Sequence, residues 1–177
     1  MTIQEDLVPV LKKLRLSGVL QTLELRTQEA VDDSLSLDEF LFRLLSDEVE
    51  RRDTKQLALR LRRARFDHAK TLKDFDFQFN PGIPKAKVID LATCHFVARR
   101  EVVCLVGPAG VGKSHLAQAL GHRACMAGHT VLFTSANQLF KDLRAARADR
   151  SFDRCMLRFT NPELLVVDDL GLRPLRD

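Results

Sequence analysis

One octapeptide constrains the fold of this chain more than any other feature of its sequence. Residues 107–114 have the sequence GPAGVGKS, which matches the pattern GxxxxGK followed by Ser or Thr at every fixed position. An apolar run at 102–106 precedes it, and a helical pattern that continues to about residue 127 follows it. A strand, a glycine-rich turn and a helix N-terminus in this order present backbone N–H groups that attract anions. We therefore predict a P-loop within an α/β fold.

The residue types of this loop suit the phosphates of a nucleoside triphosphate, which we take to be ATP. Lys113 would reach the β- and γ-phosphates as a mobile charge, and the Ser114 hydroxyl would bind Mg²⁺. His115 is expected on the first turn of the helix, without a catalytic role. The predicted nucleotide-binding residues are Gly107, Pro108, Ala109, Gly110, Val111, Gly112, Lys113, Ser114 and His115.

A second motif supplies carboxylates. The apolar run 164–167 ends at Asp168 and Asp169, a Walker B pattern. Because ligands of an open α/β sheet bind at the carboxyl ends of its strands, we expect Asp168 to hold Mg²⁺, through water. Asp169 would orient and polarise the attacking water, which makes Asp169 and Lys113 the predicted catalytic residues. Two adjacent acids favour an ATPase over a small-molecule kinase. Asp is shorter than the more frequent Glu, so we expect slow hydrolysis that suits a switch.

The first third of the chain has a helical pattern. Apolar residues recur at helical spacing up to Ser17-Gly18, a second helix is expected at 19–31, and Ser36 with Glu39 forms a capping box before a long third helix. Residues 1–70 are therefore predicted to be a small all-α domain that binds DNA or a partner. Three alternating phenylalanines and an Asn-Pro-Gly-Ile-Pro stretch at 71–84 predict a linker that packs its phenylalanines on the next domain.

Strands and helices alternate from residue 85 onward. This alternation predicts a parallel sheet with right-handed crossovers and helices on both faces. Asn137 has two interpretations, a neighbour of a helix N-cap or a contact of the γ-phosphate. The expected elements are helices at 85–98, 113–127, 136–148 and 150–159, and strands at 102–106, 130–134 and 164–167.

Basic residues crowd the fifteen positions 51–65. On a helical wheel of about 100° per residue, four of them fall within about 80° of one another, two extend that stripe, and Arg60 lies opposite. The stripe is either a solvated helix face or a surface that neutralises nucleic-acid phosphates without sequence preference. The candidate DNA contacts are Arg51, Arg52, Lys55, Arg62, Arg63 and Arg65.

The rest of the composition excludes several classes of protein. The four cysteines form no CxxC pair and no histidine stands at zinc-ligand spacing from one, so we expect free thiols in a reducing cytoplasm. No stretch approaches the roughly 18 consecutive apolar residues of a membrane helix, and the polar, acidic start at residues 1–6 argues against a signal peptide. We expect no membrane contact.

Four segments resemble the IstB-like helper ATPases of bacterial insertion sequences, relatives of the DnaC helicase loader within the AAA+ class. They are LKKLRLSGVLQTL (11–23), FDFQFNPGIPKAKVIDLAT (75–93), VCLVGPAGVGKSHLAQALGHRACMAGHTVLFT (103–134) and ELLVVDDLGLRPL (163–175). The resemblance implies an ATP-dependent regulator that oligomerises on double-stranded DNA, selects a target and stimulates a cognate transposase. Two alternatives remain open: a replicative helicase loader, and a nucleotide-binding interaction module without turnover.

The resemblance also identifies residues 85–177 as the N-terminal part of an AAA+ ATPase domain. In AAA+ modules a further strand, which bears the sensor-1 residue, lies between the P-loop strand and the Walker B strand. The chain ends at Asp177, nine residues after Asp168. We therefore expect a truncated sheet, incomplete at its C-terminus, whose unpaired ladder groups each cost about 1–3 kcal/mol. We also expect defective hydrolysis.

Overall fold

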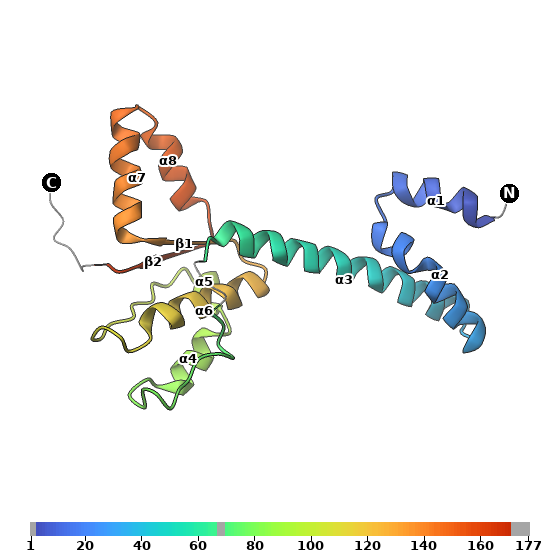
Figure 1. Cartoon of the computed structure of the whole chain (residues 1–177), viewed down its shortest axis with the longest axis horizontal. Coiled ribbons are helices and arrows are strands. Elements are labelled where there is room, and N and C mark those ends of the chain that lie inside the picture. The colour runs from blue at the N-terminus through green and yellow to red at the C-terminus, as the bar shows by residue number, and fades with distance from the viewer. Residues whose placement is uncertain (1–2, 67–69, 171–177) are drawn as a thin grey trace. The chain divides into compact units, whose positions relative to one another are not determined.

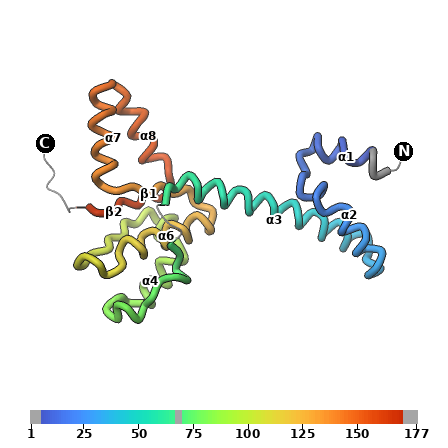
Figure 2. Tube along the Cα trace, viewed as in Figure 1, coloured from blue at the N-terminus to red at the C-terminus, as the bar shows by residue number. Residues whose placement is uncertain are grey.

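The computed structural model describes residues 3–66 and 70–170 (Figure 1; Figure 2). The end of the predicted ATPase region, 171–177, lies outside these residues, as does the end of the family-like segment at 163–175. The chain divides into two compact units, Met1–Gln56 and Leu57–Asp177. The predicted boundaries at residues 70 and 84 stay predictions. Among the described residues no helix is both long and apolar enough to cross a membrane.

The first unit consists of helices, as the sequence predicts. It holds α1 (Ile3–Lys13), α2 (Ser17–Asp32) and the first part of α3 (Leu37–Ala64) (Figure 1). The predicted capping box is present: the Ser36 hydroxyl accepts the Glu39 N–H at 3.3 Å, and the Glu39 carboxylate accepts the Ser36 N–H at 3.2 Å. The two bonds satisfy free backbone groups at the point where α3 begins.

A buried carboxylate closes the start of α2 in this unit. Glu48 of α3 accepts the backbone N–H of Gly18 and, at 3.4 Å, that of Val19. A Cβ on Gly18 would lie 2.8 Å from the Glu48 Cα, so only glycine permits this close approach. The surrounding core consists of Leu11, Val19, Leu23 and Leu44, with Leu7, Leu16, Leu20 and Phe40 packed against it.

The second unit contains the parallel strand pair. Its strands are β1 (Val131–Ser135) and β2 (Leu164–Asp168), and the register runs from Val131 opposite Leu164 to Ser135 opposite Asp168. In the view of Figure 1, α6 lies on one side of the pair and α7 and α8 on the other. The helices that follow the last turns of α3 are α4 (Lys85–Leu91), α5 (His95–Ala98), α6 (Lys113–Met126), α7 (Ala136–Ala148) and α8 (Phe152–Thr160).

A side-chain clip sets the register at the start of these strands. The Glu163 carboxylate accepts the Thr130 N–H at 2.8 Å and the Thr130 hydroxyl at 3.1 Å. It also lies 3.1 Å from His129 Nδ1. The backbone of Thr130 and then the ring of His129 lower the pKa of the Glu163 carboxyl. These bonds hold residues 130 and 163 together directly before the first strand pair, Val131 with Leu164.

The prediction of a buried strand at 102–106 is wrong. The run forms no strand, and Val102 and Val106 are 89% and 92% exposed. The physical reason is that a strand needs a partner in register. In the described residues β1 and β2 pair only with each other.

Two further boundaries and one packing prediction differ from expectation. The helix predicted at 85–98 is two helices, because Cys94 takes a left-handed φ of 62° between α4 and α5. The helix predicted from Arg150 begins at Phe152, since Arg150 has a φ of 60°. Of the three linker phenylalanines, Phe79 is 74% exposed, so the packing predicted for all three is wrong there.

Helix α6 lies between two hydrophobic clusters. One consists of Ala64, Cys94, Phe96, Val97, Ala124, Cys125 and Val131. The other consists of Phe75, Val88, Leu116 and Leu120, with Phe77 packed against it. Each buried leucine or phenylalanine stabilises the fold by about 1.5–3 kcal/mol. All four cysteines are free, and burial raises the pKa of the Cys125 thiol to about 11.

Candidate nucleotide site

The predicted P-loop leads directly into the N-terminus of α6. Gly112 is the N-cap, with a left-handed φ of 93°, and its carbonyl accepts the Leu116 N–H at 2.9 Å. A side chain at Gly112 would be strained, and its Cβ would lie 3.1 Å from the Phe75 ring. The 14-residue helix therefore begins with free N–H groups and a positive dipole end at the loop, as anion binding requires.

The Lys113 side chain bonds back to the first residues of the loop. Its ammonium donates to the carbonyls of Gly107 at 2.9 Å and Pro108 at 2.6 Å. Both acceptors are neutral, whereas phosphate oxygens are charged and form stronger bonds with an ammonium. The flexible stem of lysine allows such an exchange. The predicted role of Lys113 is thus compatible with its position.

The structure brings the two sequence motifs together. The Ser114 hydroxyl donates to Asp168 Oδ1 at 3.0 Å, although the two residues are 54 positions apart. Ser114 lies on the first turn of α6, and Asp168 is the last residue of β2. A loop and a strand-end carboxylate therefore face the same point, where the sequence analysis expected one site.

The donor set at this point fits Mg²⁺. A serine hydroxyl and a carboxylate are hard oxygen ligands, and Mg²⁺ typically takes one or two such protein ligands plus phosphates and waters. No group of three or more His, Cys, Asp or Glu residues that could hold a metal occurs among the described residues. Ser114 and Asp168 would therefore hold the ion together with the nucleotide.

Asp169 turns the chain away from β2. It has a left-handed φ of 56°, and its N–H donates to Asp168 Oδ1 at 3.0 Å. Aspartate tolerates this conformation better than most residues. Its carboxylate is exposed next to the site, and its role toward water stays a prediction.

His115 and Asn137 lie on the first turns of α6 and α7, and the part of His115 in nucleotide binding stays a prediction. His115 Nε2 lies 3.1 Å from the Thr71 carbonyl, and its ring meets Phe75 edge to face at 5.2 Å. Asn137 is exposed on the first turn of α7, where Ser135 is the N-cap and accepts the Gln138 N–H at 3.2 Å. This position fits the interpretation of Asn137 as a neighbour of a helix cap.

Two of the candidate DNA contacts are held within the first unit. Glu48 Oε1 accepts Arg51 Nη2 at 2.8 Å and Arg52 Nε at 2.6 Å. Arg52 also donates to the Arg15 carbonyl at 3.3 Å. Hydrogen bonds from Arg51 and then Arg52 hold the pKa of the Glu48 carboxyl at about 2, below its ordinary 4.5. These arginines hold the Glu48 carboxylate that accepts the first N–H groups of α2, and so they stabilise the contact between α2 and α3. Their spacing along α3 does not predict this role.

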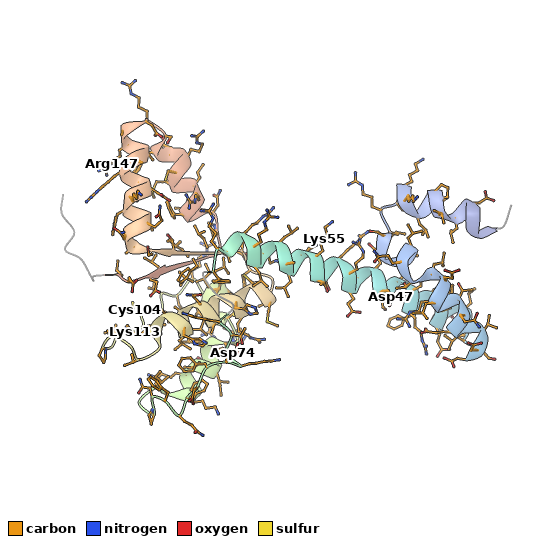
Figure 3. The ribbon with its side chains drawn as sticks, in the orientation of Figure 1. Asp47, Lys55, Asp74, Cys104, Lys113 and Arg147 are labelled. Atoms are coloured by element: carbon orange, nitrogen blue, oxygen red, sulfur yellow. The ribbon has the colours of Figure 1, made fainter. Side chains whose placement is uncertain are left out.

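The remaining basic residues of the stripe are exposed. Lys55 projects from α3 (Figure 3), and Arg62 and Arg63 are exposed near its end. The predicted position of Arg65 on the helical stripe is wrong, because α3 ends at Ala64 and Arg65 takes a left-handed φ of 60°. Lys55 belongs to the first compact unit and the three arginines belong to the second.

A second basic cluster lies on α7, on α8 and on the turn between them. Its members were not among the DNA contacts predicted from the sequence, although their spacing of three and four residues was a visible signal. Arg158 pairs with Asp142 at 2.9 Å, and Arg147 lies over the Phe152 ring at 5.4 Å. The exposed members are Lys141, Arg144, Arg147, Arg150, Arg154 and Arg158.

A glycine-rich loop that opens a helix, opposite a carboxylate at the end of a parallel strand, is how P-loop NTPases hold nucleotide. The chain has this fold. The family model for the IstB-like ATP binding protein matches residues 9–177, and the chain belongs to that family.

Curated relatives agree with this family. An ATP-binding protein in an insertion sequence of Mycobacterium tuberculosis is 41% identical over 163 residues, which cover 92% of this chain and 65% of the relative. The ATP-binding protein of insertion sequence IS21 from Pseudomonas aeruginosa is 36% identical over 170 residues, covering 96% and 64%. That of IS1162 from Pseudomonas fluorescens is 34% identical over 168 residues, covering 94% and 73%. The chain thus spans about two thirds of the length of the first two relatives.

Proposed function

We propose that this protein is a DNA-binding helper ATPase that assists a transposase in target selection and DNA transposition, with ATP hydrolysis as a switch. The observation that carries the proposal is the 3.0 Å hydrogen bond from Ser114 to Asp168, which joins the P-loop and the Walker B strand in one site. The relatives support it, because their names place them in insertion sequences.

The residues of the site divide the chemistry among them. The loop N–H groups and the α6 N-terminus would hold the phosphates of ATP, and Lys113 would neutralise the β- and γ-phosphates. Ser114 and Asp168 would bind Mg²⁺, which supplies charge neutralisation at the transferred phosphoryl group. Asp169 would orient the attacking water. Because the aspartate side chain is shorter than the more frequent glutamate, we expect slow hydrolysis of ATP.

Exposed basic side chains support double-stranded DNA as a partner. Lys55, Arg62 and Arg63 on α3, and the basic cluster on α7 and α8, can neutralise phosphates without reading bases. The proposal further includes a cognate transposase and other copies of this chain in an AAA+ oligomer. The four free thiols support action in the reducing cytoplasm.

Binding to duplex DNA with and without ATP tests this function. The whole chain is mixed with a labelled duplex of random sequence, and complexes are sized by light scattering. We expect ATP to strengthen DNA binding and to produce complexes larger than one copy. Recovery of a transposase, rather than a replicative helicase, from cells that carry the tagged protein would support the partner assignment. If the wild-type protein binds DNA with the same affinity with and without ATP, the proposed switch is contradicted.

A second candidate function is nucleotide binding without turnover. The observation that favours it is the segment 102–106, which leads into the P-loop but pairs with no strand among the described residues. A loop that lacks this support would hold phosphates with less defined geometry, and catalysis is more sensitive to geometry than binding is. Phosphate release measured beside ATP binding separates the two functions, because binding without release supports the second.

A further inference from the structure

A contact joins the P-loop to the segment that precedes α4. We call the four residues that make it the linker junction: Thr71, Phe75, Gly112 and His115. Gly112 and His115 flank Lys113 and Ser114, the two residues assigned to phosphate and Mg²⁺. All four lie in the second compact unit. The junction therefore contacts residues directly beside the two that are assigned to the nucleotide and its metal ion.

The histidine of the junction makes a directed bond. His115 Nε2 lies 3.1 Å from the Thr71 carbonyl. A carbonyl oxygen can only accept, so Nε2 carries the hydrogen and donates it. The His115 ring also meets the Phe75 ring edge to face, with centroids 5.2 Å apart and an interplanar angle of 86°. Aromatic pairs of this kind stabilise a fold beyond the effect of their buried area. The hydrogen bond to Thr71 and the contact with Phe75 therefore fix the His115 ring.

The phenylalanine of the junction lies against the loop itself. Phe75 is only 9% exposed, and its ring would be 3.1 Å from a Cβ at Gly112. It belongs to the cluster that contains Leu116 and Leu120 of α6, and it meets Phe77 at 4.9 Å. The backbone that turns P-loop into helix thus packs directly on an aromatic side chain of the linker.

The segment around these residues is a turn with its own hydrogen bonds. The Asp74 N–H donates to the Thr71 carbonyl at 3.3 Å, and the Thr71 hydroxyl donates to the Asp74 carboxylate at 2.5 Å. The Thr71 carbonyl therefore accepts both the turn's own N–H and the His115 ring. The histidine is thereby attached to the same carbonyl that closes the turn.

We propose that His115 and Phe75 are positioning residues that couple docking of the segment 71–77 to nucleotide binding in the P-loop. Successive helical residues are fixed about 100° apart, so the first turn of α6 cannot move Ser114 toward a ligand without moving His115. Binding energies at coupled sites are reciprocal. ATP therefore tightens docking of the segment by the same factor by which docking tightens ATP. The inference rests on the proposed binding of ATP by this loop.

Two measurements on the full chain test the coupling: ATP affinity by calorimetry, and amide hydrogen exchange with and without ATP. In the wild-type protein ATP is expected to slow exchange both in the loop and in residues 71–77. His115→Ala is expected to bind ATP roughly 2- to 10-fold more weakly, the equivalent of one hydrogen bond. In that variant ATP protects the loop but not the segment.

Three other variants sharpen the test. His115→Gln keeps an N–H donor for the Thr71 carbonyl and is expected to restore part of the affinity and of the segment's protection. Phe75→Leu keeps an apolar side chain, loses the ring contact and is expected to behave like His115→Ala. His122→Ala is the matched control, because it changes a histidine of α6 outside the junction. It is expected to match the wild-type protein in both measurements.

The outcomes separate this inference from the proposed function. A wild-type chain that does not bind ATP overturns both. A wild-type chain in which ATP protects the loop but leaves exchange in 71–77 unchanged overturns the coupling alone, whether or not the variants fold. The same holds if His115→Ala is folded and matches His122→Ala in both measurements. Loss of segment protection in His115→Ala, with partial return in His115→Gln, supports the coupling.

Discussion

Asp168 is the residue at which the two sequence motifs meet. Its Oδ1 atom accepts the Ser114 hydroxyl and the Asp169 N–H, both at 3.0 Å. These bonds fix the carboxylate at the end of β2 and turn the next residue out of the strand. The neighbouring acids therefore have different surroundings, and different roles are expected of them.

Substitution of the second acid tests this division. Asp169→Asn is expected to leave ATP affinity within about twofold and to lower ATP turnover by about 100-fold or more, the usual worth of a positioned acid–base group. Asparagine tolerates the left-handed backbone at this position, so the fold is kept. Calorimetry and a phosphate-release assay measure the two quantities. Turnover at the wild-type rate in the variant would remove Asp169 from catalysis.

A second residue-scale prediction concerns Glu48. Its pKa of about 2 lies below the ordinary 4.5, so its contribution to stability is present above pH 4.5 and is lost as the pH falls toward 2. Glu48→Gln is expected to lower the free energy of unfolding at pH 7 by about 1–3 kcal/mol, because the negative charge and one of the two acceptor oxygens are lost. The difference is expected to shrink between pH 4.5 and 2. Urea unfolding at several pH values measures it.

The matched control is Glu50→Gln, an exposed carboxylate on the same helix. Little change in stability is expected of it at any pH. If Glu48→Gln unfolds at the same urea concentration as the wild-type protein at pH 7, the buried network does not hold α2 against α3. A loss that stays constant down to pH 2 would contradict the assigned pKa.

Among the elements, α3 carries both structural and exposed arginines. Arg51 and Arg52 bond to Glu48, although the Arg52 side chain is also 49% exposed. Lys55, Arg62 and Arg63 are exposed as well. The exposed three are the better test of DNA contact, since removing them does not break the Glu48 network. Each lost phosphate contact lowers the slope of log affinity against log salt by about 0.9.

The combined change of Lys55, Arg62 and Arg63 to Ala is therefore expected to weaken duplex binding and to reduce that slope by about 2–3. Fluorescence anisotropy over a series of salt concentrations measures both. Arg43→Ala serves as the control, because Arg43 lies on the same helix outside the stripe, with acidic neighbours about 4 Å away. An unchanged slope in the triple variant would show that this part of α3 does not contact DNA.

Elements whose signals are local were predictable from the sequence. The capping box at Ser36 and Glu39 gave the start of α3, and the loop pattern gave the start of α6 at Lys113. The apolar run ending at Asp168 gave β2. In each case the residues that determine the element lie within a few positions of one another.

Features that depend on distant partners were not predictable. The run at 102–106 has the composition of a buried strand, but no neighbour pairs with it in the described residues. Arg52 donates to the Arg15 carbonyl across 37 positions, and His115 meets Thr71 across 44. No local pattern encodes these contacts. They determine what surrounds Arg52 and part of the candidate site.

At the scale of the whole molecule, the candidate nucleotide site lies within one compact unit. The loop, α6 and β2 all belong to the unit Leu57–Asp177. The candidate site is therefore built from residues of the second unit. We propose that residues 107–114 and Asp168 form a single Mg²⁺–ATP site within this unit.

Titration of the whole chain with ATP, with and without Mg²⁺, tests this Mg²⁺–ATP site. The wild-type protein is expected to bind ATP more tightly with Mg²⁺, and Asp168→Asn to lose that gain. Lys113→Ala is expected to bind at least about tenfold more weakly, whereas Lys141→Ala, an exposed lysine on α7, should match the wild-type protein. Normal ATP binding by Lys113→Ala would contradict the site.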